Sequence, residues 1–279
     1  MKTREKTKEL TGTLKPGNPL FLNIISSVKS ILQKYLAIII FLVIWQILPT
    51  IDVLNPLFIP TPSTIAVQMY NLTLDGTLPI ATLATFSRVL LSLGLALLVA
   101  VPIGFILGGL FKNFEKALNP LIKVIEQGNP LTLFHVAVLF IGVVELSTLF
   151  VVYWAAQWPI LNNTISGARN IDPVLVKVGR AAGLGKFDIF WKIQLPAALP
   201  TLFTGIRLGV IFAFLILLGV EMMGMSSGNG LGYYIMETQM AGMIPQMWAA
   251  IVTLAILTIS INLALLQIEK HLTKWKNGF

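Results

Sequence analysis

Residues 89–110 read VLLSLGLALLVAVPIGFILGGL, a stretch without a single charged side chain. An α-helix needs about 20 predominantly apolar residues to cross the hydrocarbon core of a bilayer, and this stretch is long enough. The bilayer interior offers no water to the backbone, so a crossing segment must satisfy its hydrogen bonds internally. The stretch therefore predicts a membrane-spanning helix.

The composition of the whole chain supports a membrane protein. Of its 279 residues, 56% are hydrophobic and only 11% are charged, whereas soluble domains carry about 25% charged residues. The net charge of +8 does not predict nucleic-acid binding, because the basic residues stand between the apolar runs. Cysteine is absent, which excludes disulfides and thiolate metal sites.

Five further apolar runs predict five further spans, so the expected fold is an all-α membrane protein with six transmembrane helices. The third run contains Gly128 and Pro130 and is expected to be kinked or broken. The expected spans are 35–51, 89–110, 119–142, 146–168, 204–225 and 247–268. The expected domains are a tail at 1–30, a transmembrane domain at 31–268 with a polar loop at 169–199, and a tail at 269–279.

The placement of Lys and Arg predicts the orientation, because short cytoplasmic loops are enriched in both. With the amino terminus inside, every Lys and Arg except Arg88 falls on the inner side. These inner segments are the two tails, residues 112–123 and residues 169–207, whereas the outer segments 52–77, 143–145 and 226–246 have none. We expect a multi-pass protein of the cell (inner or plasma) membrane with both termini in the cytoplasm.

The inner loop between the fourth and fifth runs has a distinct pattern, DPVLVKVGRAAGLGKFDIFWKIQLPAALP at residues 172–200. Asp172 followed by Pro173 is typical of the start of a helix. Gly183 and Gly185 permit a sharp reversal of the chain, since glycine tolerates positive φ. The pattern therefore predicts a helix, a glycine turn and a second short helix.

The second short helix of this loop carries exposed aromatic groups. Phe187 and Phe190 provide its apolar side chains, and Pro196 and Pro200 are expected to end it before the next span. An exposed apolar patch on a cytosolic loop is a typical docking surface for a soluble protein.

This loop resembles the cytoplasmic loop of ABC importer permeases, because Gly183 and Ile193-Gln194-Leu195-Pro196 stand at the family's spacing. The similarity extends from about residue 60 to the carboxyl end, and it is to the branch for nitrate, sulfonate, taurine, bicarbonate and related solutes. Further matching segments are Pro60-Thr61-Pro62-Ser63, Arg88-Val89, Asp172-Pro173, Thr204-Gly205-Ile206-Arg207-Leu208 and Glu221-Met222. The resemblance implies a type I importer permease-like bundle with a cytoplasmic coupling-helix loop.

The resemblance also implies a subunit with no catalytic site, metal or directly bound cofactor, since ATP and Mg²⁺ bind the partner ATPase. Two permeases, which are two copies of this chain or this chain and a paralogue, would dock on two cytosolic ATPases. An external binding protein would deliver a small oxyanion or sulfonate-like solute. The residues implied in ATPase coupling are Lys177, Gly183, Leu184, Gly185, Lys186, Phe187, Asp188 and Phe190.

One position departs from the family pattern. Lys177, Val178 and Gly179 stand where the family usually has Glu-Ala-Ala. In the family the glutamate anchors the loop by pairing with a basic group, and lysine reverses that charge. Three readings stay open: the ATPase carries a compensating acid, the chain pairs with a different permease, or the anchor is dispensable.

Polar residues inside the apolar runs are the candidates for the translocation path, because exposing them to lipid is costly. They are Glu126, Asn129, Thr132 and His135 in the third run and Glu221 in the fifth. Two of them have an alternative interpretation. Glu126 lies close enough to the cytosol to be hydrated there, and Glu221 would instead make a helix-packing or dimer-interface contact. A second functional hypothesis is an ion-coupled carrier or channel that uses Glu126, His135 and Glu221 as a relay. Inverted repeats would favour it, and none is evident.

Overall fold

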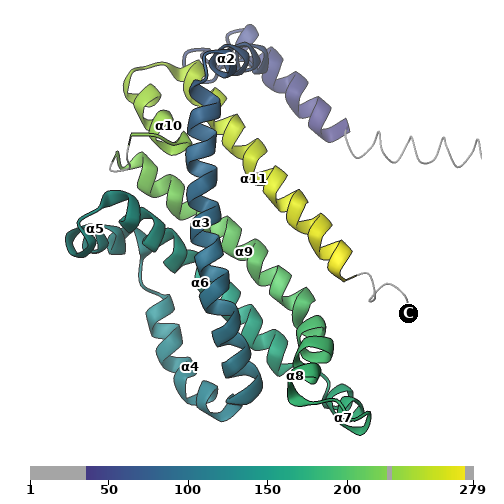
Figure 1. Cartoon of the computed structure of the whole chain (residues 1–279). Coiled ribbons are helices and arrows are strands. Elements are labelled where there is room, and N and C mark those ends of the chain that lie inside the picture. Colours follow the sequence, from purple (N-terminus) through teal and green to yellow (C-terminus); the bar gives the residue numbers. More distant parts are fainter. Residues whose placement is uncertain (1–35, 225–227, 274–279) are drawn as a thin grey trace, which may run out of the picture. The chain divides into compact units, whose positions relative to one another are not determined.

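The computed structural model describes residues 36–224 and 228–273, and every regular element in these ranges is a helix (Figure 1). The chain divides into two units, residues 1–63 and 64–279. The described part of the first unit is the apolar helix Leu36–Thr50 and the turns that follow it. Helix α2 (Pro62–Leu74) begins at the end of this unit and continues into the second.

The second unit is built around three helices that pack against one another, α3 (Thr77–Phe105), α6 (Val144–Arg169) and α9 (Leu195–Met222). Helix α11 (Ile244–Leu272) packs against α3 and α9 (Figure 1). The side chains that interlock the three central helices are small or aliphatic. They include Ala96, Val151, Ile160, Val210 and Leu217.

Glycines set the short distances between the central helices. A Cβ atom added to Gly104 on α3 would lie 2.6 Å from the Thr164 Cβ on α6. One added to Gly205 on α9 would lie 2.6 Å from the Asn163 Cβ, again on α6. Neither contact is sterically allowed, so α6 receives both neighbours only because they present glycine. This is the small-residue packing that holds helices together in lipid.

Four helical stretches are long and apolar enough to cross a membrane, and they coincide with the second, fourth, fifth and sixth predicted spans. They are Thr77–Gly109, Val144–Arg169, Lys186–Met222 and Ile244–Leu272. The predicted first span is represented by Leu36–Thr50, which at 1.5 Å per residue covers only about 22 Å. The all-helical membrane fold is thus confirmed, whereas the number of spans stays a prediction.

The third predicted span consists of two helices, α4 (Lys112–Glu126) and α5 (Pro130–Ile141), which meet at 84°. The break expected at Gly128 and Pro130 is confirmed, but residues 112–123 form a helix and not the inner loop that we expected. Helix α4 forms because it is amphipathic: Leu118 and Ile122 pack on the core, while Lys116 and Lys123 are exposed.

The loop at 169–199 is helical over most of its length, with α7 (Pro173–Ala181), α8 (Lys186–Ile189) and the π-helical turn η2 (Phe190–Gln194). Asp172 starts α7 as predicted, its Oδ1 accepting from the Val174 N–H at 2.8 Å. Gly183 adopts the predicted positive φ of 78°. Gly185 does not: its φ of −68° and ψ of 166° place it in the extended region, as the N-cap of α8.

The prediction that Pro196 and Pro200 end the second short helix is wrong. Helix α8 continues through η2 into α9 without interruption, so that Lys186–Met222 is one helical stretch. The Leu195 N–H bonds to the Phe190 carbonyl oxygen, one residue farther back than in an α-helix. Pro196 follows directly, in the first turn of α9, where its missing N–H is tolerated.

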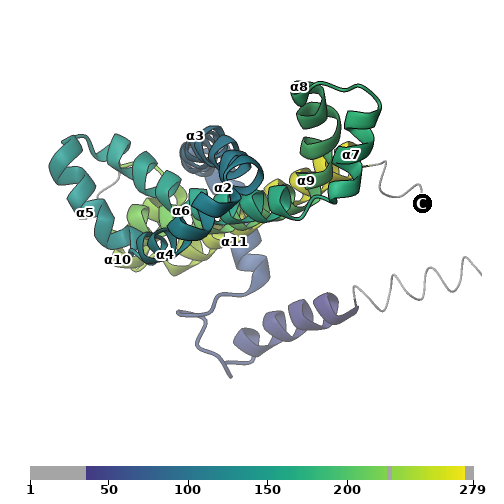
Figure 2. The same cartoon turned by 90° about the horizontal axis from the view of Figure 1, so that it is seen from below.

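The broken helix pair and the helices of the 169–199 loop lie on opposite flanks of the second unit. Helices α4 and α5 lie on one flank and α7 and α8 on the other, as both views show (Figures 1 and 2). Helix α10 (Leu231–Met240) packs against α9 and α11. The tail expected at 1–30 lies outside the described residues, and the one expected at 269–279 begins as the last turn of α11.

Candidate coupling and pathway sites

The coupling loop is a packed unit with an apolar outer surface. Gly179 of α7 is buried against Ile193 and Ile189, and a Cβ added there would lie 2.5 Å from the Ile193 Cδ1. The Leu184 N–H also bonds to the Gly179 carbonyl oxygen at 3.1 Å. The glycine therefore lets α7 lie directly on the second half of the loop, which makes the whole loop move together.

The predicted coupling residues occupy different environments within this loop. Phe187 on α8 is the most exposed of the aromatic ones, at 76%. Phe190 instead turns inward and meets Phe105 of α3 edge-on, with ring centroids 5.2 Å apart. Asp188 pairs with Lys192 at 2.7 Å on the surface. The remaining predicted positions are the turn residues Gly183, Leu184 and Gly185 and the exposed Lys186.

The coupling loop exposes several apolar side chains besides Phe187 although the loop is too polar to enter lipid. Val174, Leu175 and Val178 of α7 and Trp191 of η2 are all exposed. Exposed aliphatic and aromatic groups on a polar, tightly packed loop are suited to covering by another protein. The predicted exposure is thus found for Phe187, whereas Phe190 packs on α3 instead.

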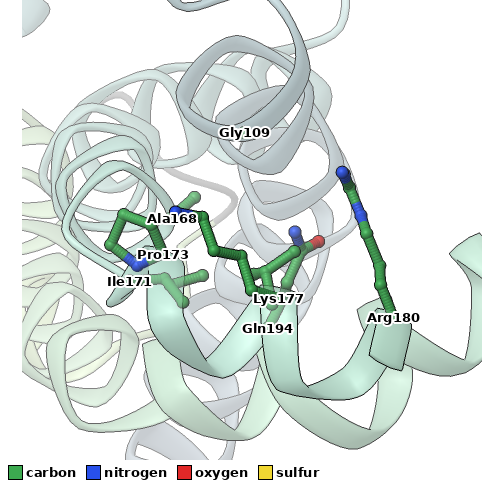
Figure 3. Close-up of a pocket in the computed structure, with 8 residues that line it drawn as sticks. Gly109, Ala168, Ile171, Pro173, Lys177, Arg180 and Gln194 are labelled. Atoms are coloured by element: carbon green, nitrogen blue, oxygen red, sulfur yellow. The ribbon is translucent and has the colours of Figure 1, made fainter. Parts of the chain in front are cut away.

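Lys177 lines a cavity of about 300 Å³ beneath the ends of the spanning helices (Figure 3). Arg180, one turn later on α7, enters the same cavity, which Gln194 and Gly109 line from the other side (Figure 3). No acidic side chain lines this cavity among the described residues. Lys177, at the position where the family has a glutamate, therefore shares this cavity with a second cation, Arg180.

Two pathway candidates at the break between α4 and α5 make local structural bonds. The Asn129 Oδ1 accepts from the Leu131 N–H at 3.0 Å and so caps α5. Glu126 accepts from Lys123 Nζ at 2.7 Å and from Asn162 Nδ2 at 3.0 Å, which ties α4 to α6. Neither bond tests whether these residues contact a solute, so pathway lining stays a prediction for both.

Thr132 and His135 lie on the exposed face of α5. They are three residues apart, so both side chains lie on the same side of the helix, and Leu139, 80% exposed, continues this face. The His135 ring stands edge-on to buried Phe134, with centroids 5.8 Å apart. The exposed face of α5 therefore carries two polar side chains, Thr132 and His135, and one apolar side chain, Leu139.

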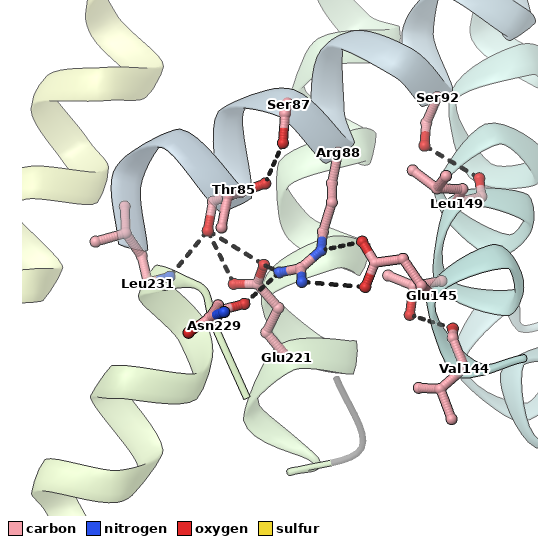
Figure 4. A network of polar contacts seen from close by, with 12 residues as sticks. Thr85, Ser87, Arg88, Ser92, Val144, Glu145, Leu149, Glu221, Asn229 and Leu231 are labelled. Atoms are coloured by element: carbon pink, nitrogen blue, oxygen red, sulfur yellow. Dashed lines mark hydrogen bonds and ion pairs between the residues drawn. The ribbon is translucent and has the colours of Figure 1, made fainter. Parts of the chain in front are cut away.

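Glu221, the deepest candidate, is enclosed by its own chain (Figure 4). Its side chain is 0% exposed and pairs with Arg88 Nη1 at 2.8 Å. It also accepts from Thr85 Oγ1 at 3.1 Å and from the Gly232 N–H at 2.9 Å. The carboxylate therefore joins α3, α9 and the start of α10, which is the helix-packing role considered from the sequence.

Arg88 completes this network by binding a second carboxylate (Figure 4). Its Nε and Nη2 donate to Glu145 of α6 at 2.7 and 3.1 Å, and its Nη1 also donates to the Asn229 carbonyl oxygen. Sequence reasoning did not select Glu145. The signal was available, because Arg88 is the only Lys or Arg outside the predicted inner segments and Glu145 lies in the predicted outer segment 143–145.

A small cavity of about 290 Å³ adjoins this network at α10. Its lining includes Gly228, Gly230, Tyr233, Tyr234 and Glu237. Burial and the charges of Asp75 and Glu237 raise the pKa of the Tyr234 phenol, so it stays protonated at neutral pH.

Comparison with known proteins identifies relatives over most of the chain. Residues 100–277 match the family described as "Binding-protein-dependent transport system inner membrane component". The taurine transport system permease protein TauC of Escherichia coli is 25% identical over 85% of this chain and 86% of its own. The nitrate import permease protein NrtB of Synechocystis is 30% identical over 81% and 83%, respectively. The putative aliphatic sulfonates transport permease protein SsuC of Bacillus subtilis is 30% identical over 86% of each chain.

Solved structures show the same fold. A chain of the MetNI methionine ABC transporter in an inward-facing conformation superposes with a TM-score of 0.57, at 19% identity, over 69% of this chain and 94% of that one. At this identity the likeness concerns the arrangement of the helices alone.

Proposed function

The chain belongs to the binding-protein-dependent transport family and is an ABC importer permease, and from this premise we propose that it forms, with a second permease, the path for a small oxyanion or sulfonate-like solute. The solute class is drawn from relatives named for taurine, nitrate, aliphatic sulfonates and bicarbonate. An external binding protein delivers the solute. Family membership does not favour the ion-coupled carrier or channel.

The proposed topology has six spans with both termini in the cytoplasm. The Leu36–Thr50 helix provides the first span, and the broken pair α4 and α5 provides the third. The distribution of Lys and Arg supports this orientation. It directs the coupling loop toward the cytosol and Glu145 toward the outside.

The observation that carries the proposed mechanism is the exposed Phe187 on a loop that is otherwise tightly packed. In the proposed assembly this aromatic group enters a groove on a cytosolic ATPase, which binds ATP and Mg²⁺, and each of two ATPases receives one such loop. Closure of the ATPases then rotates the loop as a rigid body. Because α8 continues into α9, the rotation reaches a spanning helix directly.

For the path itself, we propose that Thr132 and His135 line the solute route on the exposed face of α5. Asn129 supports that face by capping α5, and Glu126 and Glu221 maintain the packing of the helices behind it. The exposed face of α5 would then meet the second permease, since a solute path needs a second wall. Exposure of Thr132 and His135 in the single chain supports this assignment.

The test is co-purification of the tagged full-length chain from its host. The expected partner is an ATPase with a Walker-type nucleotide site, and vesicles containing both proteins and the binding protein should take up the oxyanion only with ATP. Phe187→Ala should weaken ATPase binding at least tenfold without lowering the chain's stability. Phe58→Ala, which alters a phenylalanine that is 69% exposed and lies outside both α5 and the coupling loop, is the matched control. Uptake driven by an ion gradient alone would refute the proposal.

A further inference from the structure

Two cavities adjoin each other at the end of α3, and they differ in chemistry. The first is the 300 Å³ cavity of Lys177 and Arg180. The second has a volume of about 780 Å³ and lies between α3 and the α8–η2–α9 stretch. Gly109 and Gln194 line both, so the two cavities adjoin at these residues, one with cations in its lining and the other mainly apolar.

The second compartment is apolar along its length. Val101, Pro102 and Phe105 line it from α3, and Phe190 and Trp191 line it from η2. It lies along the end of a helical stretch, Thr77–Gly109, that is long and apolar enough to cross a membrane. A chain of methylene groups satisfies such a wall, whereas a polar peptide would leave its backbone without partners.

The cationic end, in contrast, favours a negatively charged group. Lys177 and Arg180 approach the same space from successive turns of α7 (Figure 3). Both side chains are exposed and no acidic side chain lines the cavity among the described residues, so an anion there would be attracted by two cations. Gln194 adds an amide donor, and Gly109 leaves room, since a Cβ built there would meet no heavy atom within 4 Å.

We propose that the joined cavities bind one anionic phospholipid, its phosphate between Lys177 and Arg180 and one acyl chain along Phe105 and Trp191. The order of the two compartments matches this ligand: the cations lie on the loop, outside the membrane, and the apolar groove runs along α3 into it. A free anion would leave the groove without an occupant. An acidic segment of a protein would fill only the cationic end.

The bound lipid would lie beside the direct contact of the coupling loop with α3, where Phe190 meets Phe105. Lys186 and Phe187, which are proposed to contact the ATPase, also line the apolar groove. The acyl chain therefore supports α8 from behind. The lipid is a structural part of the loop that the ATPase meets, and its loss would leave α8 less firmly seated.

The experiment is native mass spectrometry of the purified full-length chain with phosphatidylglycerol or phosphatidylcholine of identical acyl chains. The unaltered chain should retain one phosphatidylglycerol preferentially. K177Q/R180Q should weaken that binding about 25-fold, because each cation near an anionic headgroup contributes about a factor of five. K116Q/K270Q, which removes two exposed lysines outside both cavities, should leave it unchanged. Gly109→Phe should weaken the binding of both lipids.

Three results would overturn the proposal. One is equal retention of the two lipids by the unaltered chain, and another is equal loss from K177Q/R180Q and K116Q/K270Q. The third is displacement of the lipid by millimolar inorganic phosphate or by the ATPase, which would assign the cations to a free anion or to an acidic segment of the partner. The measurement without ATPase or solute does not depend on the importer mechanism, so either proposal can fail while the other holds.

Discussion

Replacing Arg88 by methionine tests whether the outer network holds the helices together. The Arg88 side chain is only 5% exposed and Glu221 is 0% exposed, so the R88M variant leaves a buried carboxylate without its cation. Removing one partner of a buried ion pair costs about 3–5 kcal/mol. The Asn229 carbonyl also loses its donor. We therefore expect R88M to lose about 3–5 kcal/mol of unfolding free energy.

Glu145 provides the internal comparison, because it binds the same guanidinium and its side chain is 40% exposed. Water can hydrate the exposed part of this side chain when its ion pair with Arg88 is lost. E145Q should therefore lower the free energy of unfolding by about 1 kcal/mol or less. The double variant R88M/E221M removes both buried charges and should be more stable than R88M alone.

The assay is reversible unfolding of the purified chain in mixed micelles, titrated with sodium dodecyl sulfate and followed by far-ultraviolet circular dichroism. Equal losses for R88M and E145Q would show that burial does not determine the strength of the network. Additive losses for R88M and Glu221→Met would show that the two residues do not act as a pair.

Three further variants test other parts of the structure. Gly205→Leu should destabilise the chain by more than about 3 kcal/mol in the same titration, because the leucine side chain would overlap α6. Gly94→Ala is the control: a Cβ at Gly94 meets no atom within 4 Å, so this variant should be neutral or slightly stabilising. Asn129→Ala should cost about 1 kcal/mol through the lost cap of α5, and Asn129→Asp, which keeps the acceptor, should restore most of it. His135→Ala should lower ATP-driven solute uptake at least fivefold while leaving the unfolding midpoint and the co-purification of the ATPase unchanged; unaltered uptake would exclude His135 from the path.

The spans and the loop were predictable because their signals are local. An apolar run such as 89–110 has one stable solution in a bilayer, and Asp172 before Pro173 starts a helix through its own side chain. Gly183 likewise adopts its turn conformation without help from distant residues.

Other features depend on distant contacts and were not predictable in this way. The continuation of α8 into α9 past Pro196 requires a π-helical turn, which no residue type specifies. The partners of Glu221 lie far away in the sequence, on α3 and at the start of α10. The direction of Lys177 likewise depends on which face of α7 Gly179 presents to Ile193.

Helices α8 and α9 belong to one continuous helical stretch, Lys186–Met222, which carries Phe187 near one end and Glu221 near the other. The direction of this stretch changes at the π-helical turn η2 (Figure 2). Helix α9 alone has 28 residues and is about 42 Å long. A tilt of about 5° around its Leu195 end displaces its Met222 end by about 4 Å, which exceeds the length of any hydrogen bond in the Arg88 network. A rotation of the coupling loop that tilts α9 would therefore change the hydrogen-bond partners of Glu221.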